Sequence, residues 1–251
     1  MLMQTGLNVF SVSPVGSVWF AMMQSNLAGK VIVAVLFGGS ICAWTLMVTK
    51  VRELLQASRS SRRFLAAYRK EAHPASLFLK RQRFDGSPLY AIYDKACNAL
   101  GAALEARGPD TDDLFMGGVG TSQSTLGKVR VASVRNIAER AMADQALLLE
   151  NHMGLLATAA STAPFLGLLG TVWGVMEAFG GMAVKGSAML SAVAPGISGA
   201  LLTTVVGLLV ALPSAVGYNM LSDKIRRFSV EMDNFVEELM SSVECQYLEE
   251  P

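Results

Sequence analysis

Three long apolar segments constrain the fold of this chain more than any other feature. The first covers residues 31–49, between Lys30 and Lys50; the second covers 153–176 and the third about 188–221. A helix rises 1.5 Å per residue, so about 20 apolar residues cross the hydrocarbon layer of a membrane. Charged residues are only 16% of the chain, against roughly 25% in soluble domains. We therefore predict an all-α integral membrane protein with three transmembrane helices.

Basic residues cluster beside these segments, and their distribution predicts the orientation of the chain. Seven follow the first span and three follow the third: Lys50, Arg52, Arg59, Arg62, Arg63, Arg69 and Lys70, then Lys224, Arg226 and Arg227. By contrast, Lys30 alone precedes the first span, and Lys185 alone separates the second from the third. Because short loops rich in Lys and Arg stay in the cytoplasm, we expect the N-terminus outside and the C-terminus in the cytoplasm.

The remaining segments are predicted to be mostly helical. Residues 1–28 are expected to lie at the outer interface, because Trp19 and Phe20 suit a membrane surface, and they lack the features of a signal peptide. Residues 51–150 are expected to form a helical cytoplasmic region, and residues 222–251 a cytoplasmic C-terminal helix. The transmembrane helices with their flanks are then assigned to 29–50, 151–182 and 187–221.

Two finer predictions concern these helical regions. From about Thr125 the helical pattern continues through Glu150 into the second span, which predicts one long helix without interruption. The C-terminal segment is amphipathic, and its apolar stripe consists of Phe228, Met232, Phe235 and Leu239.

No pattern in the chain indicates an enzyme. The segment "GTSQSTLGK" at 120–128 resembles a phosphate-binding loop, but that motif requires a glycine where Ser122 stands. The three cysteines form no CxxC pair, and His73 and His152 are far apart, so no metal site is expected. We expect no catalytic residue and no cofactor. The basic clusters suit membrane topology and not nucleic-acid binding.

Small residues occupy one side of the third span. A helix turns about 100° per residue, which places these residues on one arc: Gly196, Gly199, Ala200, Thr203, Thr204, Gly207, Ala211, Ser214 and Gly217. Large residues form the opposite arc: Leu201, Leu202, Val205, Leu208, Leu209 and Leu212. Val210 and Ser198 are exceptions, each among the other class. Pro195 and Pro213 lie near the ends of this span, where a lost backbone hydrogen bond is best tolerated.

The second span is divided in the same way. Its small face contains Ala160, Ala163, Gly167, Gly170, Thr171, Gly174, Ala178 and Gly181. Its large face contains Phe165, Leu169, Val172 and Met176. Two interpretations fit these faces. Small residues let membrane helices pack closely, or the hydroxyl groups among them line a hydrated cavity that relays an ion.

Glu177 is the acidic residue nearest the predicted membrane region. By helical phase it lies beside Gly170 and Gly174, at the edge of the small face and near the outer end of its span. Two interpretations are again open: an interfacial acid in contact with water, or a charged site at which a cation enters.

Two stretches in these spans resemble the MotA/TolQ/ExbB proton-channel family. They are "LLATAASTAPFLGLLGTVWGVMEAF" at 155–179 and "VAPGISGALLTTVVGLLVALPSAVGYN" at 193–219. The C-terminal "EMDNFVEEL" is also similar, and the likeness covers about residues 135–240. Within the family it points to the three-span TolQ/ExbB branch.

The resemblance implies an architecture and a function. It implies a pentameric ring subunit of a proton-motive-force-driven motor in the bacterial inner membrane, around a one-span ExbD/TolR-like partner whose aspartate carries the ion. A TonB/TolA-like protein is a further candidate partner, and the proton is the expected coupling ion. Thr171 and Thr204 match family threonines expected to line the ion path, with Thr203 and Glu177 as further candidates. The glycines expected to line the pore or pack the helices are Gly167, Gly170, Gly174, Gly196, Gly199 and Gly207, and Pro164, Pro195 and Pro213 are expected to shape the helices.

One position departs from the family pattern. Where the branch usually has a glutamate after Pro-Gly-Ile, "PGISGALL" has Gly199. Either the partner supplies the carboxylate chemistry, or Glu177 contributes, or the coupling differs. A second hypothesis is therefore a structural membrane scaffold that conducts no ion, in which the small faces only pack. The sequence does not distinguish Tol–Pal, TonB-type import or motility, nor proton from sodium.

Overall fold

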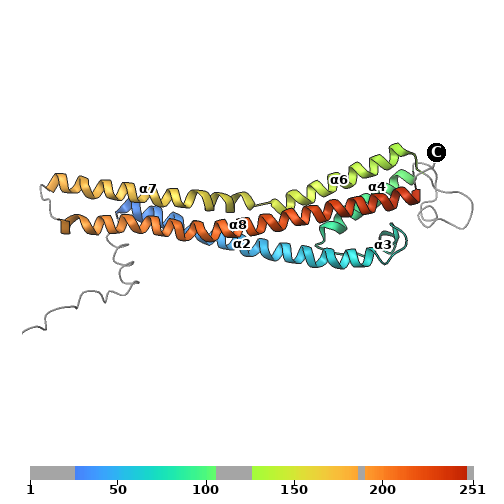
Figure 1. Cartoon of the computed structure of the whole chain (residues 1–251), viewed down its shortest axis with the longest axis horizontal. Helices are drawn as coiled ribbons and strands as arrows, with labels where there is room; N and C mark the ends of the chain where they lie inside the picture. The colour runs from blue at the N-terminus through green and yellow to red at the C-terminus, as the bar shows by residue number, and fades with distance from the viewer. Residues whose placement is uncertain (1–25, 106–125, 186–189, 248–251) are drawn as a thin grey trace, which may run out of the picture. The chain divides into compact units, whose positions relative to one another are not determined.

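The computed structural model describes residues 26–105, 126–185 and 190–247, and these are nearly all helical (Figure 1). In chain order the helices are α2 (Leu27–Tyr68), α3 (Ser76–Leu79), α4 (Pro88–Glu105), α6 (Lys128–Glu150), α7 (Met153–Lys185) and α8 (Leu190–Tyr247). The predicted interfacial segment with Trp19 and Phe20 lies outside the described residues, as does most of the segment 120–128.

Three helices carry the three predicted spans. Each of α2, α7 and α8 contains a stretch that is long and apolar enough to cross a membrane. Both α2 and α8 continue without interruption beyond their apolar segments, so each contributes to two compact units. Among the described residues, the first unit contains 26–47, 152–185 and 190–219, and the second contains 48–105, 126–151 and 220–247.

The predicted uninterrupted helix from about Thr125 into the second span is wrong. α6 ends at Glu150 and α7 begins at Met153. Between them, Asn151 has an extended ψ of 137°, and His152 has a φ of 66°, in the left-handed region that commonly ends helices. Neither proline nor glycine stands at 151 or 152, and the helical pattern on both sides concealed the break, although asparagine is common at helix ends and Gly154 follows closely.

The core of the first unit joins three helices. A buried cluster contains Leu36 of α2, Ala163 of α7, and Val210 and Ala211 of α8. Three half-buried residues pack against it: Ile32, Leu166 and Val206. Near the other end of this unit, a side chain at Gly217 of α8 would collide with Met47 of α2. The α2 helix therefore packs along one side of α7 and α8.

The core of the second unit is built from large aromatic side chains. Phe64 of α2 is fully buried and its ring lies 5.4–6.1 Å from five others: Tyr68, Phe84, Tyr90, Tyr93 and Phe235. The predicted apolar stripe of the C-terminal segment is confirmed as a buried face, since all four of its residues are at most 5% exposed. Helices α4 and α6 also pack together in this unit (Figure 1).

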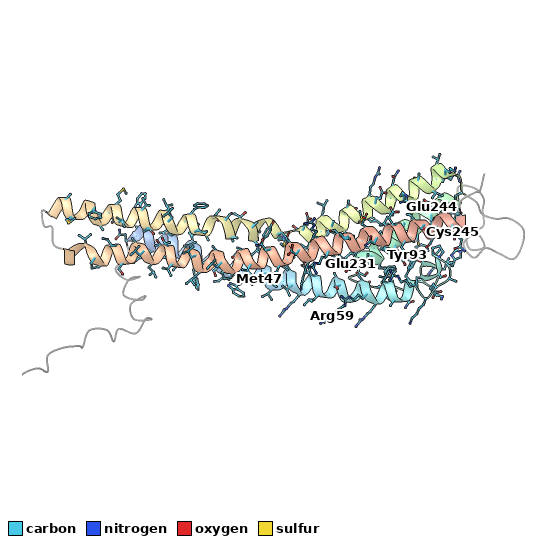
Figure 2. The ribbon with its side chains drawn as sticks, viewed as in Figure 1. Met47, Arg59, Tyr93, Glu231, Glu244 and Cys245 are labelled. Atoms are coloured by element: carbon cyan, nitrogen blue, oxygen red, sulfur yellow. The ribbon has the colours of Figure 1, made fainter. Side chains whose placement is uncertain are left out.

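Hydrogen bonds and ion pairs complete this second unit. Tyr93, which lies between the helices (Figure 2), donates to the Pro74 carbonyl oxygen at 2.7 Å and accepts from the Phe78 amide at 3.1 Å. Burial raises the pKa of the Tyr93 hydroxyl, and it raises the pKa of the Cys97 thiol to about 12. Both groups are therefore protonated at neutral pH.

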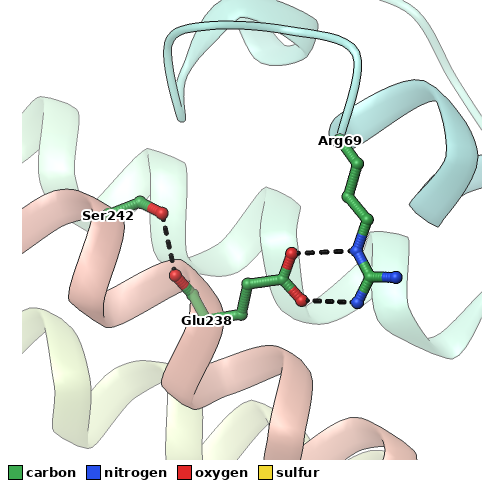
Figure 3. Close-up of polar contacts among 3 residues, drawn as sticks. All are labelled: Arg69, Glu238 and Ser242. Carbon is green, nitrogen blue, oxygen red and sulfur yellow. Dashed lines mark hydrogen bonds and ion pairs between the residues drawn. The ribbon is translucent and has the colours of Figure 1, made fainter.

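A bidentate ion pair connects the C-terminal part of α8 to Arg69, the residue that follows α2 (Figure 3). The Arg69 guanidinium donates to both oxygens of Glu238, at 3.0 and 2.8 Å. The Ser242 hydroxyl donates to the Glu238 backbone carbonyl at 2.9 Å. Because Arg69 is largely exposed, water screens the attraction between these charges.

Candidate functional site

The contact between α7 and α8 in the first unit, hereafter the seam, consists of the two small-residue faces. A Cβ atom added to Gly167 would lie 2.8 Å from the Thr203 carbonyl oxygen and 3.0 Å from Thr204 Cα. A Cβ added to Gly207 would lie 2.6 Å from the Ala163 carbonyl oxygen. The obstacles are backbone atoms, so a side chain at either glycine would force the helices apart. The small faces of the two helices are therefore in close contact, as the packing interpretation requires.

Other predicted glycines also lie in or beside the seam. Added Cβ atoms at Gly170, Gly174 and Gly196 would meet the side chains of Thr203, Ala200 and Ala178 respectively. Gly199 is buried. Most large residues on the opposite arcs are exposed, and Leu202 alone among them is half-buried. The exposed ones are Phe165, Leu169, Val172, Met176, Leu201, Val205, Leu208, Leu209 and Leu212. The division of each helix into a packed small side and an exposed large side is therefore confirmed, except at Leu202 and at Gly181, which is exposed and whose added Cβ would meet nothing within 4 Å.

Three threonines meet at the centre of the seam. The hydroxyls of Thr171 and Thr204 contact each other, and Thr203 Oγ1 lies 3.5 Å from Thr171 Oγ1. All three hydroxyls lie within hydrogen-bonding distance of the Gly167 carbonyl oxygen, at 2.9–3.2 Å. Thr171 and Thr203 can also donate to the Ala200 carbonyl oxygen, at 3.2 and 2.7 Å. The structure thus brings together the three predicted threonines and two backbone carbonyls.

The threonine cluster opens toward one edge of the seam. Thr203 is fully buried, whereas Thr171 and Thr204 are half-buried. On α8, a side chain at Gly217 would collide with Met47 of α2, and a thirteen-residue separation places Gly217 about 140° around the helix from Thr204. Thr204 therefore lies on the side of the seam away from α2, hereafter the free edge. By the same geometry Thr171 lies about 140° around α7 from Leu166, which packs against the buried cluster that contains Leu36 of α2.

Glu177 does not join this cluster. Its side chain is exposed and accepts a hydrogen bond of 2.7 Å from the amide of Asn26, just before α2. It lies six residues beyond Thr171, which is about 9 Å along the helix axis. This contact does not distinguish an interfacial acid in contact with water from a site at which a cation enters. Glu177 is the only acidic residue in the sequence between residues 153 and 222, so the seam itself carries no carboxylate.

The three predicted prolines lie inside helices. Pro164 is within α7, and Pro195 and Pro213 are within α8. Since α8 continues to Tyr247, Pro213 is in the helix interior although it is close to the end of the apolar span. A proline has no amide hydrogen, so Pro164 cannot donate to the Ala160 carbonyl and Pro213 cannot donate to that of Leu209.

One group of hydroxyl residues on α7 was not predicted as functional. Thr158, Ser161 and Thr162 are all exposed, and their spacing of three and four residues places them on one face. That spacing, within an otherwise apolar span, was the sequence signal that could have indicated this polar face.

The sequence of this chain is similar to those of known membrane proteins of one family. The model of the MotA/TolQ/ExbB proton channel family matches residues 111–234, which include the seam. A Tol-Pal system protein TolQ of Haemophilus influenzae is 28% identical, over 89% of this chain and 92% of its own length. A biopolymer transport protein ExbB of Pseudomonas putida is 31% identical over 87% of this chain, which spans 60% of that protein. An ExbB of Salmonella typhimurium is 28% identical over 95% of this chain.

Proposed function

Because the chain belongs to the MotA/TolQ/ExbB proton channel family, we propose that it is the ring subunit of a motor driven by the proton motive force. Five copies would surround a one-span ExbD/TolR-like partner in the inner membrane. The N-terminus would lie outside and the C-terminus in the cytoplasm. Ion flow between ring and partner would energise work at the outer membrane or envelope, through a TonB/TolA-like protein in some systems.

One observation carries the proposal: the threonine cluster at the free edge of the seam. Thr171 and Thr204 are half-buried there, with hydroxyls in contact and backed by the Gly167 carbonyl oxygen. Hydroxyl groups can both donate and accept hydrogen bonds, so this pair can relay a proton or replace part of an ion's hydration shell. A partner helix beside the free edge would bring its own carboxylate to these hydroxyls.

The partner has to supply that carboxylate because the seam lacks one. Gly199 occupies the position where the branch usually has a glutamate, and Glu177 lies about 9 Å from Thr171 along the axis. In the proposed mechanism the ring subunit therefore contributes hydroxyls and carbonyls, and the charged group that binds and releases the ion belongs to the partner.

A specific observation also favours the alternative of a non-conducting scaffold. The hydroxyls of Thr171, Thr203 and Thr204 already have backbone carbonyls as partners. Buried polar groups satisfied in this way hold helices together. In a scaffold, the seam would serve packing alone and no ion would cross the complex.

The experiment that separates these functions is ion flux in vesicles. The chain would be purified with its one-span partner, the mass of the complex measured, and proton and sodium uptake recorded separately under a membrane potential. We expect proton flux that Thr171→Val or Thr204→Val abolishes while the mass of the complex stays the same. Valine keeps nearly the same volume but removes the hydroxyl.

Thr45→Val is the matched control, because Thr45 bonds the Ile41 carbonyl on α2, outside the seam. It should leave the flux unchanged. An intact complex without flux of either ion would favour the scaffold, and full flux in both seam variants would refute the proposed ion path. Sodium flux in place of proton flux would change the coupling ion but keep the motor.

A further inference from the structure

A tyrosine, Tyr218, lies on the same side of α8 as the threonine cluster. It follows Thr204 by fourteen residues, which is about 40° around the helix and 21 Å along it. It is about 20° around the helix from Gly207 of the seam and about 100° from Gly217, where a side chain would collide with Met47 of α2. Tyr218 is half-buried. Its side chain therefore leaves α8 between the seam and the free edge, away from α2.

The hydroxyl of Tyr218 differs from the other hydroxyls in this part of α8. Thr203 donates to the Ala200 carbonyl, and Ser214 donates to the Val210 carbonyl. The Tyr218 hydroxyl makes no hydrogen bond to any residue within 26–105, 126–185 and 190–247. A tyrosine hydroxyl at a partly buried position usually has a partner, so water or another protein has to supply it.

Pro164 frees a backbone acceptor on α7, at the same edge of the seam. Because proline has no amide hydrogen, the Ala160 carbonyl cannot receive the usual helical hydrogen bond from position 164. Ala160 is half-buried and lies eleven residues before Thr171, which is about 20° around α7 and 16 Å along it. This carbonyl is therefore at the free edge, in line with Thr171.

Along the seam, Ala160 lies between the threonine cluster and Tyr218. A Cβ added to Gly207 would lie 2.6 Å from the Ala163 carbonyl oxygen, which puts these two positions level. Because α7 and α8 run antiparallel, position 160 is level with about position 210 of α8. Tyr218 is eight residues further, which is about 12 Å along the axis. The order along the free edge is thus threonine cluster, carbonyl, phenol.

Mostly small side chains line the free edge between these groups. Between Thr204 and Tyr218, the α8 residues within about 40° of Thr204 are Leu208, Ala211 and Ala215. Ala215 is half-buried, and Leu208, the one large residue of the three, is 45% exposed. Alanine covers little of the backbone beside it, so water at this edge can reach the Ala160 carbonyl.

We propose that the Ala160 carbonyl and the Tyr218 hydroxyl continue the proton path from the threonine cluster toward the end of the span that the basic flanks assign to the cytoplasm. The inference rests on the proposed function and deepens it, because it names the cytoplasmic end of the path. Water along the free edge donates to the carbonyl. The phenol oxygen accepts a proton from one water molecule as its own proton passes to the next, so the tyrosine ends the step neutral.

Thiol labelling tests for water on the free edge without reference to flux. Ala215→Cys would be made with Cys42→Ala and Cys245→Ser, which remove the two exposed native cysteines. Cys97 remains, because it is buried and the pKa of its thiol is raised to about 12. The chain and its one-span partner, in inverted vesicles that present the cytoplasmic side of the membrane, are treated with a charged, membrane-impermeant maleimide.

The matched control is Val216→Cys, one residue further along α8 and about 100° around it, on the large arc. Val216 is 58% exposed whereas Ala215 is half-buried, so exposure in the single chain predicts faster labelling at Val216→Cys. Only a thiolate in contact with water reacts, so water confined to the free edge predicts that Ala215→Cys labels at least about tenfold faster. Equal rates, a faster Val216→Cys, or no labelling at Ala215→Cys overturns the inference.

Flux connects the two groups to the path. Tyr218→Phe keeps the ring and removes the hydroxyl, and Pro164→Ala restores the amide donor to the Ala160 carbonyl. Each should lower proton flux several-fold while the mass of the complex stays the same. Tyr90→Phe is the matched control, because Tyr90 lies in the aromatic core of the second unit and the same chemical change there should leave flux unchanged.

The outcomes separate this inference from the proposed function. If Tyr218→Phe or Pro164→Ala keeps full flux while Thr171→Val abolishes it, the role of that group is refuted and the proposed function stands. If the unaltered complex conducts no ion, the proposed function fails and this extension of its path fails with it.

Discussion

The seam of the first unit and the core of the second unit are both helix contacts, but opposite kinds of residue build them. In the seam, glycines at 167 and 207 bring backbone atoms of two helices together, and hydroxyls bond to carbonyls. In the second unit, Phe64 lies among five aromatic rings, and ion pairs lie at the periphery. Large apolar side chains gain little by leaving lipid for protein, so membrane helices associate through small residues. In water the burial of apolar area dominates.

The largest effect is expected in the aromatic core. Phe64→Ala removes a fully buried ring and its five aromatic contacts, so we expect a loss of about 3–5 kcal/mol in the free energy of unfolding. Denaturant unfolding of the purified chain in detergent measures it. Leu55→Ala is the control on the same helix, because Leu55 is 42% exposed and should change stability by less than about 0.5 kcal/mol. Equal losses in both variants would contradict the assigned core.

A smaller effect is expected in the seam, where the destabilising change is the addition of a side chain and not its removal. Gly167→Ala adds one methyl group against backbone atoms of α8 and should destabilise the chain by about 1–3 kcal/mol. Gly180→Ala, on the same helix, meets nothing within 4 Å and should be neutral or stabilising by up to about 1 kcal/mol. Thermal unfolding in detergent compares the two. If Gly167→Ala were as well tolerated as Gly180→Ala, the close approach of α7 and α8 would be wrong.

The smallest effect is expected at the periphery of the second unit. Arg69→Gln breaks the bidentate ion pair with Glu238. Because the arginine is 59% exposed, the free energy of unfolding should fall by at most about 1 kcal/mol, and by less in high salt. Arg63→Gln, at an exposed position near the end of α2, serves as the control for loss of one positive charge. A loss that did not depend on salt would show that Arg69 acts through packing.

Much of the seam was predictable because helical geometry is local. The 100° turn per residue places Gly167, Gly170 and Gly174 on one face whatever surrounds them, and the same holds for Thr203 and Gly207. The apolar stripe with Phe235 was predictable for the same reason. The break at Asn151 and His152 was not predicted, because the helical patterns on either side continue through it and only weak signals, Asn151 and the nearby Gly154, mark it.

The amino-acid sequence by itself determined which segments are apolar, which face of each helix is small, and where hydroxyls interrupt those faces. These properties depend on residue type and on the fixed period of a helix. Only the tertiary structure decided that α2 covers one side of the seam, through Leu36 and Met47, and leaves Thr171 and Thr204 at the other edge. That choice depends on contacts between helices far apart in the chain, where the fit of backbone and side chains decides which of several apolar faces pack together.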